Sequence, residues 1–464
     1  MPENTDKKSL RRSKRMKNKQ KIAYAVGNIG GLAIAQSSIL LLYTHYFANL
    51  KIPITALGIS LILVIYGIWD AVNEPLLGHL SDLTRSKLGR RKPFIIIGCI
   101  PLIIFSVLIY TVPPGLSPLW TWVYLLVILI AYESSVTAVV TSWYSLYAET
   151  SLNEKERVDT SKFMQIFGIV GLVIGLGGAP MISGAFGEKY LLGYGIMGGV
   201  LAIITVLSML PTILKVKENP NYQIQKEEEK YPFFESVKTS FKNKSFVFFV
   251  IVQFLLQLAY AVVVSSLPLF FKGILLLGDL EYSLILLCAF LTVIPALFLW
   301  MKVAEKKGSK FALFASMICF GAVFPFVFFM NTVPVAIIIL LLAGFGLSGL
   351  MMFPTVLLGD VIDEDQVKTK KRREGYYAGV SGVLVKLSSA ISWGVIGIVV
   401  TIFNIPRDTL GITVLTGLPK LGLQVLVGVI PVIIMIIGLM CLWKYPLSGD
   451  RLKQVKIHVE EMNK

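Results

Sequence analysis

Long apolar runs alternate with short polar segments from one end of the sequence to the other. Each run holds about the 20 residues that an α-helix needs to cross the hydrocarbon core of a bilayer. Backbone groups inside a bilayer must find partners within the same segment, so such runs fold as helices. The pattern predicts twelve spans, at approximately 23–48, 54–80, 94–112, 119–147, 161–184, 190–214, 246–273, 279–301, 311–330, 332–359, 375–404 and 420–444.

The longest polar stretch separates the sixth span from the seventh and predicts a linker between two six-helix halves. The sequence therefore divides into a basic N-terminal tail, a first half, a linker, a second half and a C-terminal tail, at residues 1–22, 23–214, 215–245, 246–444 and 445–464. Two halves of six helices are the layout of the major facilitator fold. The prediction is an all-α polytopic membrane protein of that fold.

Charge agrees with this layout and fixes an orientation. A net charge of +16 would suit a nucleic-acid-binding protein, but the basic residues lie in the gaps between apolar runs. Only a few Lys and Arg fall on the side away from the termini, namely Lys51, Lys189, Lys272, Arg407 and Lys420. Because basic residues concentrate in cytoplasmic loops, both termini are predicted to be cytoplasmic. Topology thus explains the positive charge, and no nucleic-acid partner is expected. The expected location is the plasma membrane.

Several function classes lack the motifs that they require. The four cysteines lie singly in apolar runs and the three histidines are scattered, which argues against disulfides and a structural metal site. Neither a Gly-x4-Gly-Lys-Ser/Thr loop nor a His-Glu-x-x-His helix occurs, so an ATP-driven pump and an intramembrane enzyme are not expected. We expect a monomeric transporter without cofactors, whose partners are the bilayer and a small solute. A membrane sensor without flux is the other class that stays open.

Four ionisable residues fall inside the predicted spans: Asp70, Glu74, Glu133 and Lys386. A charge at the centre of a spanning helix costs roughly 2.5–3.5 kcal/mol, so such residues indicate function. Asp70, Asn73 and Glu74 share one helix face and offer oxygen donors for a small cation or a shared proton. At 1.5 Å per residue, Asp70 lies roughly 15 Å and Lys386 roughly 17 Å below the cytoplasmic end of its span, in one layer.

Lys386 is the natural partner of the acidic pair, and a cation that enters between the carboxylates would compete with its ammonium. The alternative is a buried ion-pair network that only holds helices together, which is a poor source of stability. Glu133 has three open roles, as a proton site, a substrate contact, or a protonated acid facing a neighbouring helix. Trp143 and Tyr144 are candidates for stacking on a solute, although aromatic residues in a span more often serve packing.

A weak internal repeat follows the second and eighth spans. Residues 78–92 contain an Asp and a Gly-Arg-Arg-Lys turn, and residues 304–310 hold a shorter basic copy. Such a loop can pin neighbouring helices by charge pairs in one state and release them in another, which makes Asp82, Arg90 and Arg91 candidate gating residues. A basic loop that only sets topology is the alternative.

In combination, three motifs resemble the glycoside-pentoside-hexuronide:cation symporter family, to which melibiose permease belongs. They are residues 69–75 (Trp-Asp-Ala-Val-Asn-Glu-Pro), residues 86–93, and residues 371–375 followed by Lys386. The resemblance implies a sodium site formed by the acids and Asn of the second helix together with Thr137 on the fourth. It further implies cytoplasmic gating residues at Asp360, Asp363, Arg372 and Arg373.

The sequence differs from the family pattern at positions that bear on the choice of coupling ion and of substrate. Glu74 stands where the family has Asp, one methylene shorter, so the choice between Na+ and H+ stays open. The acids that hold galactosides in the family fall near Leu32 and Val140, so polar groups such as Glu133 and Thr141 would have to compensate. The resemblance implies cation-coupled symport of a small organic solute such as a sugar or glycoside, with a lysolipid or other amphiphile as the alternative.

Overall fold

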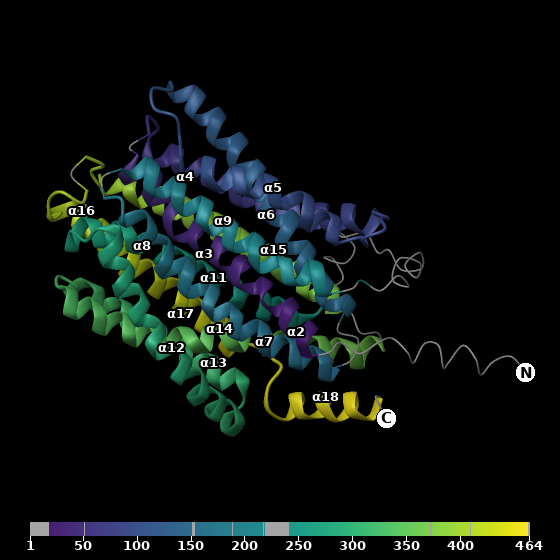
Figure 1. Ribbon diagram of the computed structural model, residues 1–464. Coiled ribbons are helices and arrows are strands. Elements are labelled where there is room, and N and C mark those ends of the chain that lie inside the picture. Colours follow the sequence, from purple (N-terminus) through teal and green to yellow (C-terminus); the bar gives the residue numbers. More distant parts are fainter. Residues whose placement is uncertain are drawn as a thin grey trace, which may run out of the picture.

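A computed structural model of the chain describes residues 18–50, 52–150, 154–187, 189–216, 218, 241–370, 374–408 and 410–462. Every regular element in these ranges is a helix, and the long helices run side by side as one bundle (Figure 1). Eleven helices in the described ranges are long and apolar enough to cross a membrane. The shorter apolar helix α5 (Lys92–Leu108), about 25 Å long at 1.5 Å per residue, supplies the twelfth.

The helices match the predicted spans in order and position, which confirms the fold class. The first six crossings are α2 (Asn18–Ala25) with α3 (Gly27–Thr44) and η1 (His45–Asn49), α4 (Ala56–Leu83), α5, α6 (Pro118–Thr150), α7 (Glu154–Val173) with η2 (Ile174–Gly178) and α8 (Ala179–Gly184), and α9 (Tyr190–Lys215). The last six are α11 (Lys244–Phe270) with η4 (Phe271–Leu275), α12 (Asp279–Lys307), α13 (Ser309–Val323) with η5 (Phe324–Phe329), α14 (Val333–Thr369), α15 (Glu374–Ile402), and α16 (Gly417–Gln424) with η6 (Val425–Val429) and α17 (Ile430–Trp443). Most of the predicted linker and N-terminal tail lies outside the described residues.

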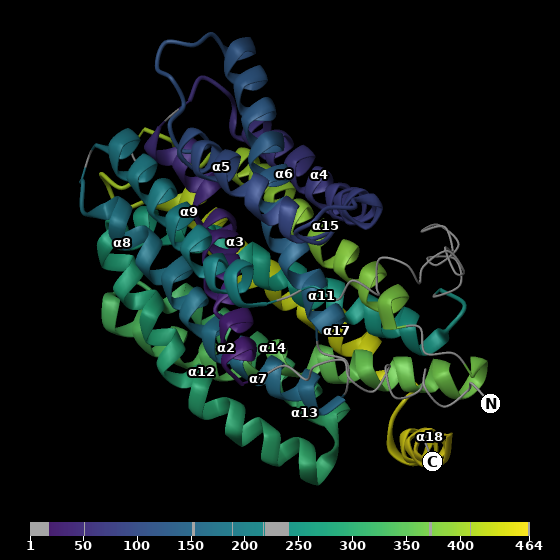
Figure 2. The same ribbon diagram turned by 45° about the vertical axis from the view of Figure 1, so that its right-hand side comes forward.

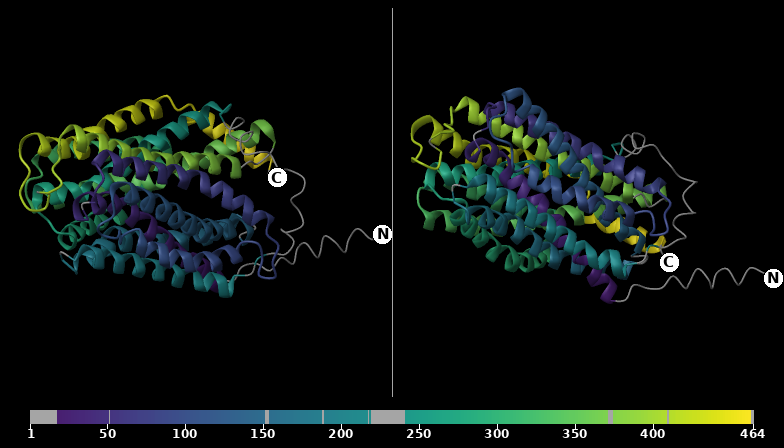
Figure 3. Two further views of the ribbon diagram at one scale, coloured as in Figure 1. Left: turned by 90° about the horizontal axis from the view of Figure 1, so that it is seen from above. Right: turned by 45° about the horizontal axis from the view of Figure 1, so that its top comes forward.

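The beginning of α2 and the C-terminal helix lie at the same end of the bundle (Figures 1 and 3). We call this end the terminal side and the other end the opposite side. An even number of crossings requires this arrangement, because each crossing reverses the direction of the chain. The twelve crossings therefore agree with the predicted placement of both tails on one side.

A helix that the hydropathy pattern does not predict follows the last crossing. Helix α18 (Gly449–Met462) lies on the terminal side against the end of α14, and Figure 2 views it almost along its axis. It is short and carries many charges, so it lacks the long apolar run that marks a span. Buried Val455 and the buried Tyr445 and Leu447 just before it anchor this segment to the rest of the molecule.

Among the described residues, four crossings contain a π-helical turn, in which the hydrogen bonds run one residue further along the chain. Two of these turns occupy corresponding places, because η1 ends the first crossing and η4 ends the seventh, both on the opposite side. The other two, η2 and η6, lie within the fifth and twelfth crossings. Single π turns inside α-helices occur often at functional sites.

Candidate functional site

Three ionisable side chains meet between α4 and α15. Lys386 Nζ lies 2.5 Å from Asp70 Oδ1 and 3.1 Å from Glu74 Oε2. The two acids are four residues apart on α4, so their carboxylates share one helix face. The side chains of Asp70, Glu74 and Lys386 keep 24%, 35% and 25% of their surface exposed, which leaves room for a small ion to approach.

Small residues bring α4 and α15 close enough for this contact. A Cβ atom added to Gly67 would lie 2.5 Å from the Cβ atom of Ala390, and one added to Gly397 would overlap the Ser60 side chain. Small residues at a helix contact let backbones in a membrane approach closely. Lys386 can therefore contact the acids of α4 because Gly67 and Gly397 let the two helices pack closely.

Glu133 on α6 has a hydrogen-bond set of its own. Tyr66 Oη donates to Glu133 Oε2 at 2.7 Å, and Thr137 Oγ1 donates to Glu133 Oε1 at 3.3 Å. Asn73 Nδ2 donates to the backbone carbonyl of Glu133 at 3.3 Å. The family resemblance groups Asn73 and Thr137 with the acids of α4, whereas both hydrogen bonds turn these side chains toward Glu133.

Glu133 also adds a third carboxyl group to the charged cluster. Its side chain is buried, and the charges of Asp70 and Lys386 act on it. Sequence spacing did not reveal Tyr66 as its partner, because the two residues lie on different helices. A buried carboxyl group held by two hydroxyl donors is positioned for a polar role rather than for apolar packing.

Two of the candidate substrate contacts lie next to the cluster, toward the terminal side. Thr141 Oγ1 donates to Glu74 Oε1 at 3.3 Å. Tyr144 Oη donates to Asn28 Oδ1 at 2.9 Å, and 42% of the Tyr144 surface is exposed. Thr141 thus places a hydroxyl beside the acids and Tyr144 an aromatic ring with exposed surface. Asn28, by contrast, is buried, and its amide nitrogen donates to the Met164 carbonyl at 2.8 Å.

Trp143, the other aromatic candidate, does not join them in this conformation and takes the packing role that the sequence analysis gave as the more frequent one. Its indole Nε1 donates to the backbone carbonyl of Tyr24 at 3.0 Å, and the two rings stack with centroids 4.8 Å apart. The side chain is fully buried, so it exposes no surface in this conformation. Leu32 and Val140 are half-buried and supply no polar group at the positions where galactoside permeases carry acids.

The basic loop after α4 is held by an acid that the sequence analysis did not identify. The two carboxylate oxygens of Glu218 accept hydrogen bonds of 2.7–3.3 Å from the backbone N–H groups of Arg90, Arg91 and Lys92. A Cβ atom at Gly89, which has a φ of +107°, would overlap this carboxylate. Glu218 thus caps the N-terminus of α5, where unpaired N–H groups attract negative charge.

Two basic side chains of this loop, those of Arg91 and Lys92, contact the first six helices. Arg91 Nη1 donates to Ser81 Oγ and, at 3.3 Å, to the carbonyl of Gly78. Lys92 Nζ donates to the carbonyl of Ile213 at 2.8 Å, which ties α5 to the end of α9. The Asp82 side chain, Arg372 and Arg373 lie outside the described residues.

Of the two acids expected to help close the terminal side, Asp360 near the end of α14 faces α18, and so does Glu364, an acid that the sequence analysis did not identify. Asp360 Oδ1 lies 3.3 Å from Lys456 Nζ, and Glu364 Oε1 lies 2.5 Å from Arg451 Nη2. Asp363 is half-buried on the same helix. In this conformation the C-terminal helix therefore neutralises two acids of α14.

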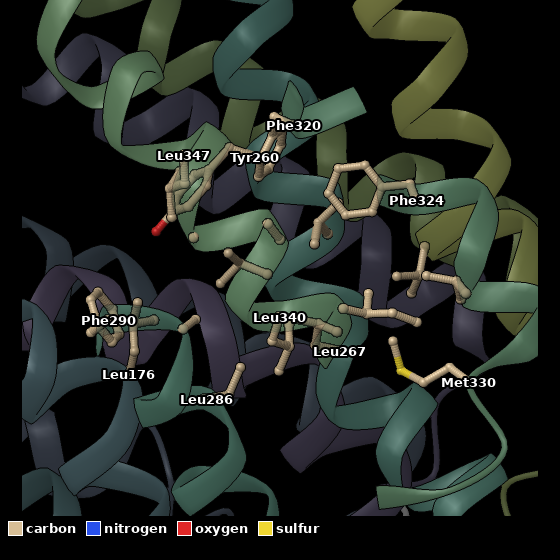
Figure 4. A pocket seen from close by; sticks show the side chains of 18 residues that line it. Leu176, Tyr260, Leu267, Leu286, Phe290, Phe320, Phe324, Met330, Leu340 and Leu347 are labelled. Atoms are coloured by element: carbon tan, nitrogen blue, oxygen red, sulfur yellow. The ribbon is translucent and has the colours of Figure 1, made fainter. Parts of the chain in front are cut away.

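An apolar pocket lies within the last six helices, next to η2 of the first six. It is partly open and exposes only apolar atoms. Side chains of α11, α12, α13, η5 and α14 line it, among them Leu267, Phe290, Phe324 and Leu340 (Figure 4). The Tyr260 hydroxyl points away and donates to Gln36 Oε1 at 2.9 Å.

Comparison with known proteins agrees with this architecture. The family described as MFS/sugar transport protein matches residues 23–449. The sodium-dependent lysophosphatidylcholine symporter 1 of Mus musculus is 23% identical and aligns with 97% of this chain and 89% of its own length. The isoprimeverose transporter of Lactiplantibacillus pentosus is 24% identical, over 77% of this chain and 75% of that protein.

Among solved structures, the crystal structure of a D-xylose-proton symporter superposes with a TM-score of 0.63 at 14% identity. The superposition covers 92% of this chain and 97% of that structure. At such low identity, the likeness bears on the fold alone.

Proposed function

From the premise that the chain belongs to the MFS/sugar transport protein family, we propose that Asp70, Glu74 and Lys386 couple solute transport to a cation. The chain is a multi-pass membrane transporter. The observation that carries the proposal is the ammonium of Lys386 in contact with both carboxylates of α4. A cation that enters between these carboxylates would compete with the ammonium for them, because both positive charges draw on the same two acids.

The cluster also connects the two groups of six helices. Asp70 and Glu74 belong to the first six, whereas Lys386 belongs to the last six. Cation binding would therefore weaken a contact between the halves at the depth of the solute site. This gives the ion a way to change the relative stability of the conformations that alternate during transport.

Na+ is the coupling ion that we propose. Carboxylate and hydroxyl oxygens are hard donors that suit such a cation, and the mouse relative is named a sodium-dependent symporter. Asn73, Thr137 and Glu133 form the neighbouring polar layer that would orient the site. A proton shared by the same acids is the alternative, and the ion dependence of binding separates the two.

We further propose that the linker at 215–245 joins the halves and that the protein acts as a monomer.

We also propose that the terminal side is cytoplasmic and that the membrane is a plasma membrane. The positive charge on the terminal side supports this orientation. A thiol-reactive, impermeant reagent applied to intact cells tests it at Lys464→Cys in a cysteine-free background. Labelling from outside the cells would contradict the orientation.

A sugar or glycoside is the substrate class that we propose first. Thr141 supplies a hydroxyl beside Glu74, and Tyr144 supplies an aromatic ring with exposed surface. Sugars need several such partners, since each hydroxyl must exchange its water for a protein group. The name of the isoprimeverose transporter points the same way.

A second class, an amphiphile with an alkyl chain, is favoured by the apolar pocket. A pocket that exposes only apolar atoms would take a hydrocarbon tail and offers nothing to a sugar. Leu32 and Val140, apolar where the galactoside permeases carry acids, favour the same class. The relative named a lysophosphatidylcholine symporter carries such a substrate by name.

Ligand binding to the purified protein tests both ion and substrate. Thermal stability is measured with Na+, Li+ or choline at two pH values, each with a panel of glycosides and a panel of lysolipids. We expect Na+ to raise the melting temperature and to enhance the shift caused by one panel, since a bound ligand stabilises the folded state. Equal shifts in choline and Na+ would contradict sodium coupling, and a response to lysolipids alone would select the second class.

A further inference from the structure

A closed ring of four polar side chains lies on the opposite side of the bundle, far from the coupling site. Lys272 Nζ donates to Asn49 Oδ1 at 2.8 Å, and Asn49 Nδ2 donates to Tyr194 Oη at 2.8 Å. Tyr194 Oη donates to Asp279 Oδ2 at 2.7 Å, and Asp279 Oδ1 lies 2.8 Å from Lys272 Nζ. Lys272, Asp279 and Tyr194 are buried, so water does not compete for these bonds.

The ring consists of two pairs, one from each half. Asn49 and Tyr194 belong to the first six helices, and Lys272 and Asp279 belong to the last six. Two of the four contacts cross between the halves, from Lys272 to Asn49 and from Tyr194 to Asp279. If the halves separate, each keeps its own pair, and the charge of Lys272 stays beside that of Asp279.

This division suits a contact that opens repeatedly. Breaking a buried ion pair is strongly unfavourable, because it leaves an uncompensated charge. Here opening exchanges two hydrogen bonds between the halves for bonds to water and leaves the ion pair intact. A contact built only to hold the halves together would have no need of this arrangement.

The local backbone supports the same interpretation. Asn49 ends the π turn η1, and Lys272 lies in the π turn η4, so corresponding turns of the two halves face each other. His45, also in η1, stacks on the Tyr194 ring with centroids 3.8 Å apart and holds it toward Asp279. The two π turns therefore position Asn49 and Lys272, which form one of the two contacts between the halves.

Close packing surrounds the ring and completes the closure. A Cβ atom added to Gly184 would lie 2.5 Å from the backbone nitrogen of Leu280, so the first and last six helices touch at this level. Nearby, Arg407 donates hydrogen bonds of 2.6 and 2.5 Å to the carbonyls of Ile52 and Ile54. The opposite side is thus shut, while Glu74 and Tyr144 nearer the terminal side keep exposed surface.

We propose that the ring of Asn49, Tyr194, Lys272 and Asp279 is the gate of the opposite side. It is closed when the coupling site opens toward the terminal side. The two contacts between the halves, Lys272–Asn49 and Tyr194–Asp279, break when the coupling site opens toward the opposite side. The conformation described is therefore the one in which this gate is shut.

The test compares two buried tyrosines on the same side. Tyr194→Phe removes a crossing hydrogen bond to Asp279. Tyr46→Phe is the matched control, because Tyr46 Oη donates to the carbonyl of Ile109 at 2.7 Å and both belong to the first six helices. Ser265→Cys, buried between the halves where its hydroxyl meets the Ile39 carbonyl, is the reporter in a background without native cysteines.

An impermeant thiol reagent is applied from the opposite side, and the rate of labelling at position 265 is measured. A hydrogen bond to a charged group changes an equilibrium by about tenfold or more. We therefore expect Tyr194→Phe to raise the labelling rate about tenfold and Tyr46→Phe to leave it unchanged. Asn49→Ala, which removes the other crossing contact, should raise it as well.

Melting temperatures measured in parallel separate gating from general loosening. A gate predicts faster labelling in Tyr194→Phe at a melting temperature no lower than that of Tyr46→Phe. Unchanged labelling in both Tyr194→Phe and Asn49→Ala would overturn the proposal. Equal increases in Tyr194→Phe and Tyr46→Phe would overturn it too, since the effect would then follow from loss of any buried hydroxyl.

Discussion

The ammonium of Lys386 lies 2.5 Å from Oδ1 of Asp70, although 316 positions separate the two residues in the chain. This contact joins the eleventh crossing to the second at the depth where the acids of α4 and the carboxyl group of Glu133 gather. Its chemistry allows a cation to replace the ammonium. Substitutions at this contact should therefore impair cation-coupled transport without preventing the protein from folding.

Asp70→Asn should abolish cation-driven uptake while preserving the fold. The amide keeps the size of the side chain but removes the charge that the cation and Lys386 share. Uptake into proteoliposomes driven by a Na+ gradient measures the loss, which we expect to be at least tenfold. Asp450→Asn, at an exposed position of α18, is the control. If Asp70→Asn kept wild-type uptake while Asp450→Asn did too, the coupling site would lie elsewhere.

Glu74→Asp should move the ion preference toward Na+. The shorter side chain restores the acid of the resembling symporter family and withdraws the carboxylate from Lys386 and Thr141 by one methylene. Ligand reach and cavity size decide selectivity among small cations. The ratio of Na+-driven to Li+-driven and H+-driven uptake measures the change, and Glu74→Gln should remove the response to ions. An identical ratio in all three proteins would contradict a role for Glu74 in the site.

Lys386→Ala should destabilise the protein, and Asp70→Asn should partly restore it. Loss of one partner leaves unpaired acids in the membrane; since a quarter of the Lys386 side chain is exposed, we expect roughly 2 kcal/mol rather than the 3–5 kcal/mol typical of fully buried pairs. Chemical denaturation of the single and double variants measures the coupling energy. Additive effects would mean that the two side chains do not interact in the membrane-embedded protein.

Glu133→Gln should lower the apparent affinity for the cation. It removes the ionisable carboxyl group but keeps the shape of the side chain, so we expect a severalfold decrease. Tyr66→Phe is the control, because it removes the hydrogen bond to Glu133 and leaves the carboxyl group. Cation titrations of ligand binding compare the two variants. Equal decreases in both would assign the effect to the hydrogen bond instead of the carboxyl group.

Glu218→Ala should loosen the start of α5. Loss of an N-terminal cap typically costs about 1 kcal/mol, and three backbone N–H groups lose their acceptor together. Thermal unfolding measures the decrease. Glu305→Ala, at an exposed position of α12, should have no effect. An unchanged melting temperature in Glu218→Ala would mean that water replaces the carboxylate without loss.

The pattern of apolar runs was sufficient to predict the twelve crossings and their order. A bilayer imposes a fixed length and internal backbone pairing on each crossing, so local hydropathy carries that information. Helical spacing likewise was sufficient to place Asp70 and Glu74 on one face. Helix α18 escaped prediction because a short, charged helix at the end of a bundle obeys neither constraint.

The sequence by itself determined the fold class, the predicted orientation of the termini and the acids that a spanning helix carries at a cost. Only the tertiary structure decided that Tyr66 of α4 faces Glu133 of α6, that Trp143 packs against Tyr24, and that Glu218 caps α5. The same holds for the ring that joins Asn49 to Lys272. These contacts depend on the rotation and approach of helices distant in sequence, which glycines such as Gly67 permit and which no local periodicity encodes.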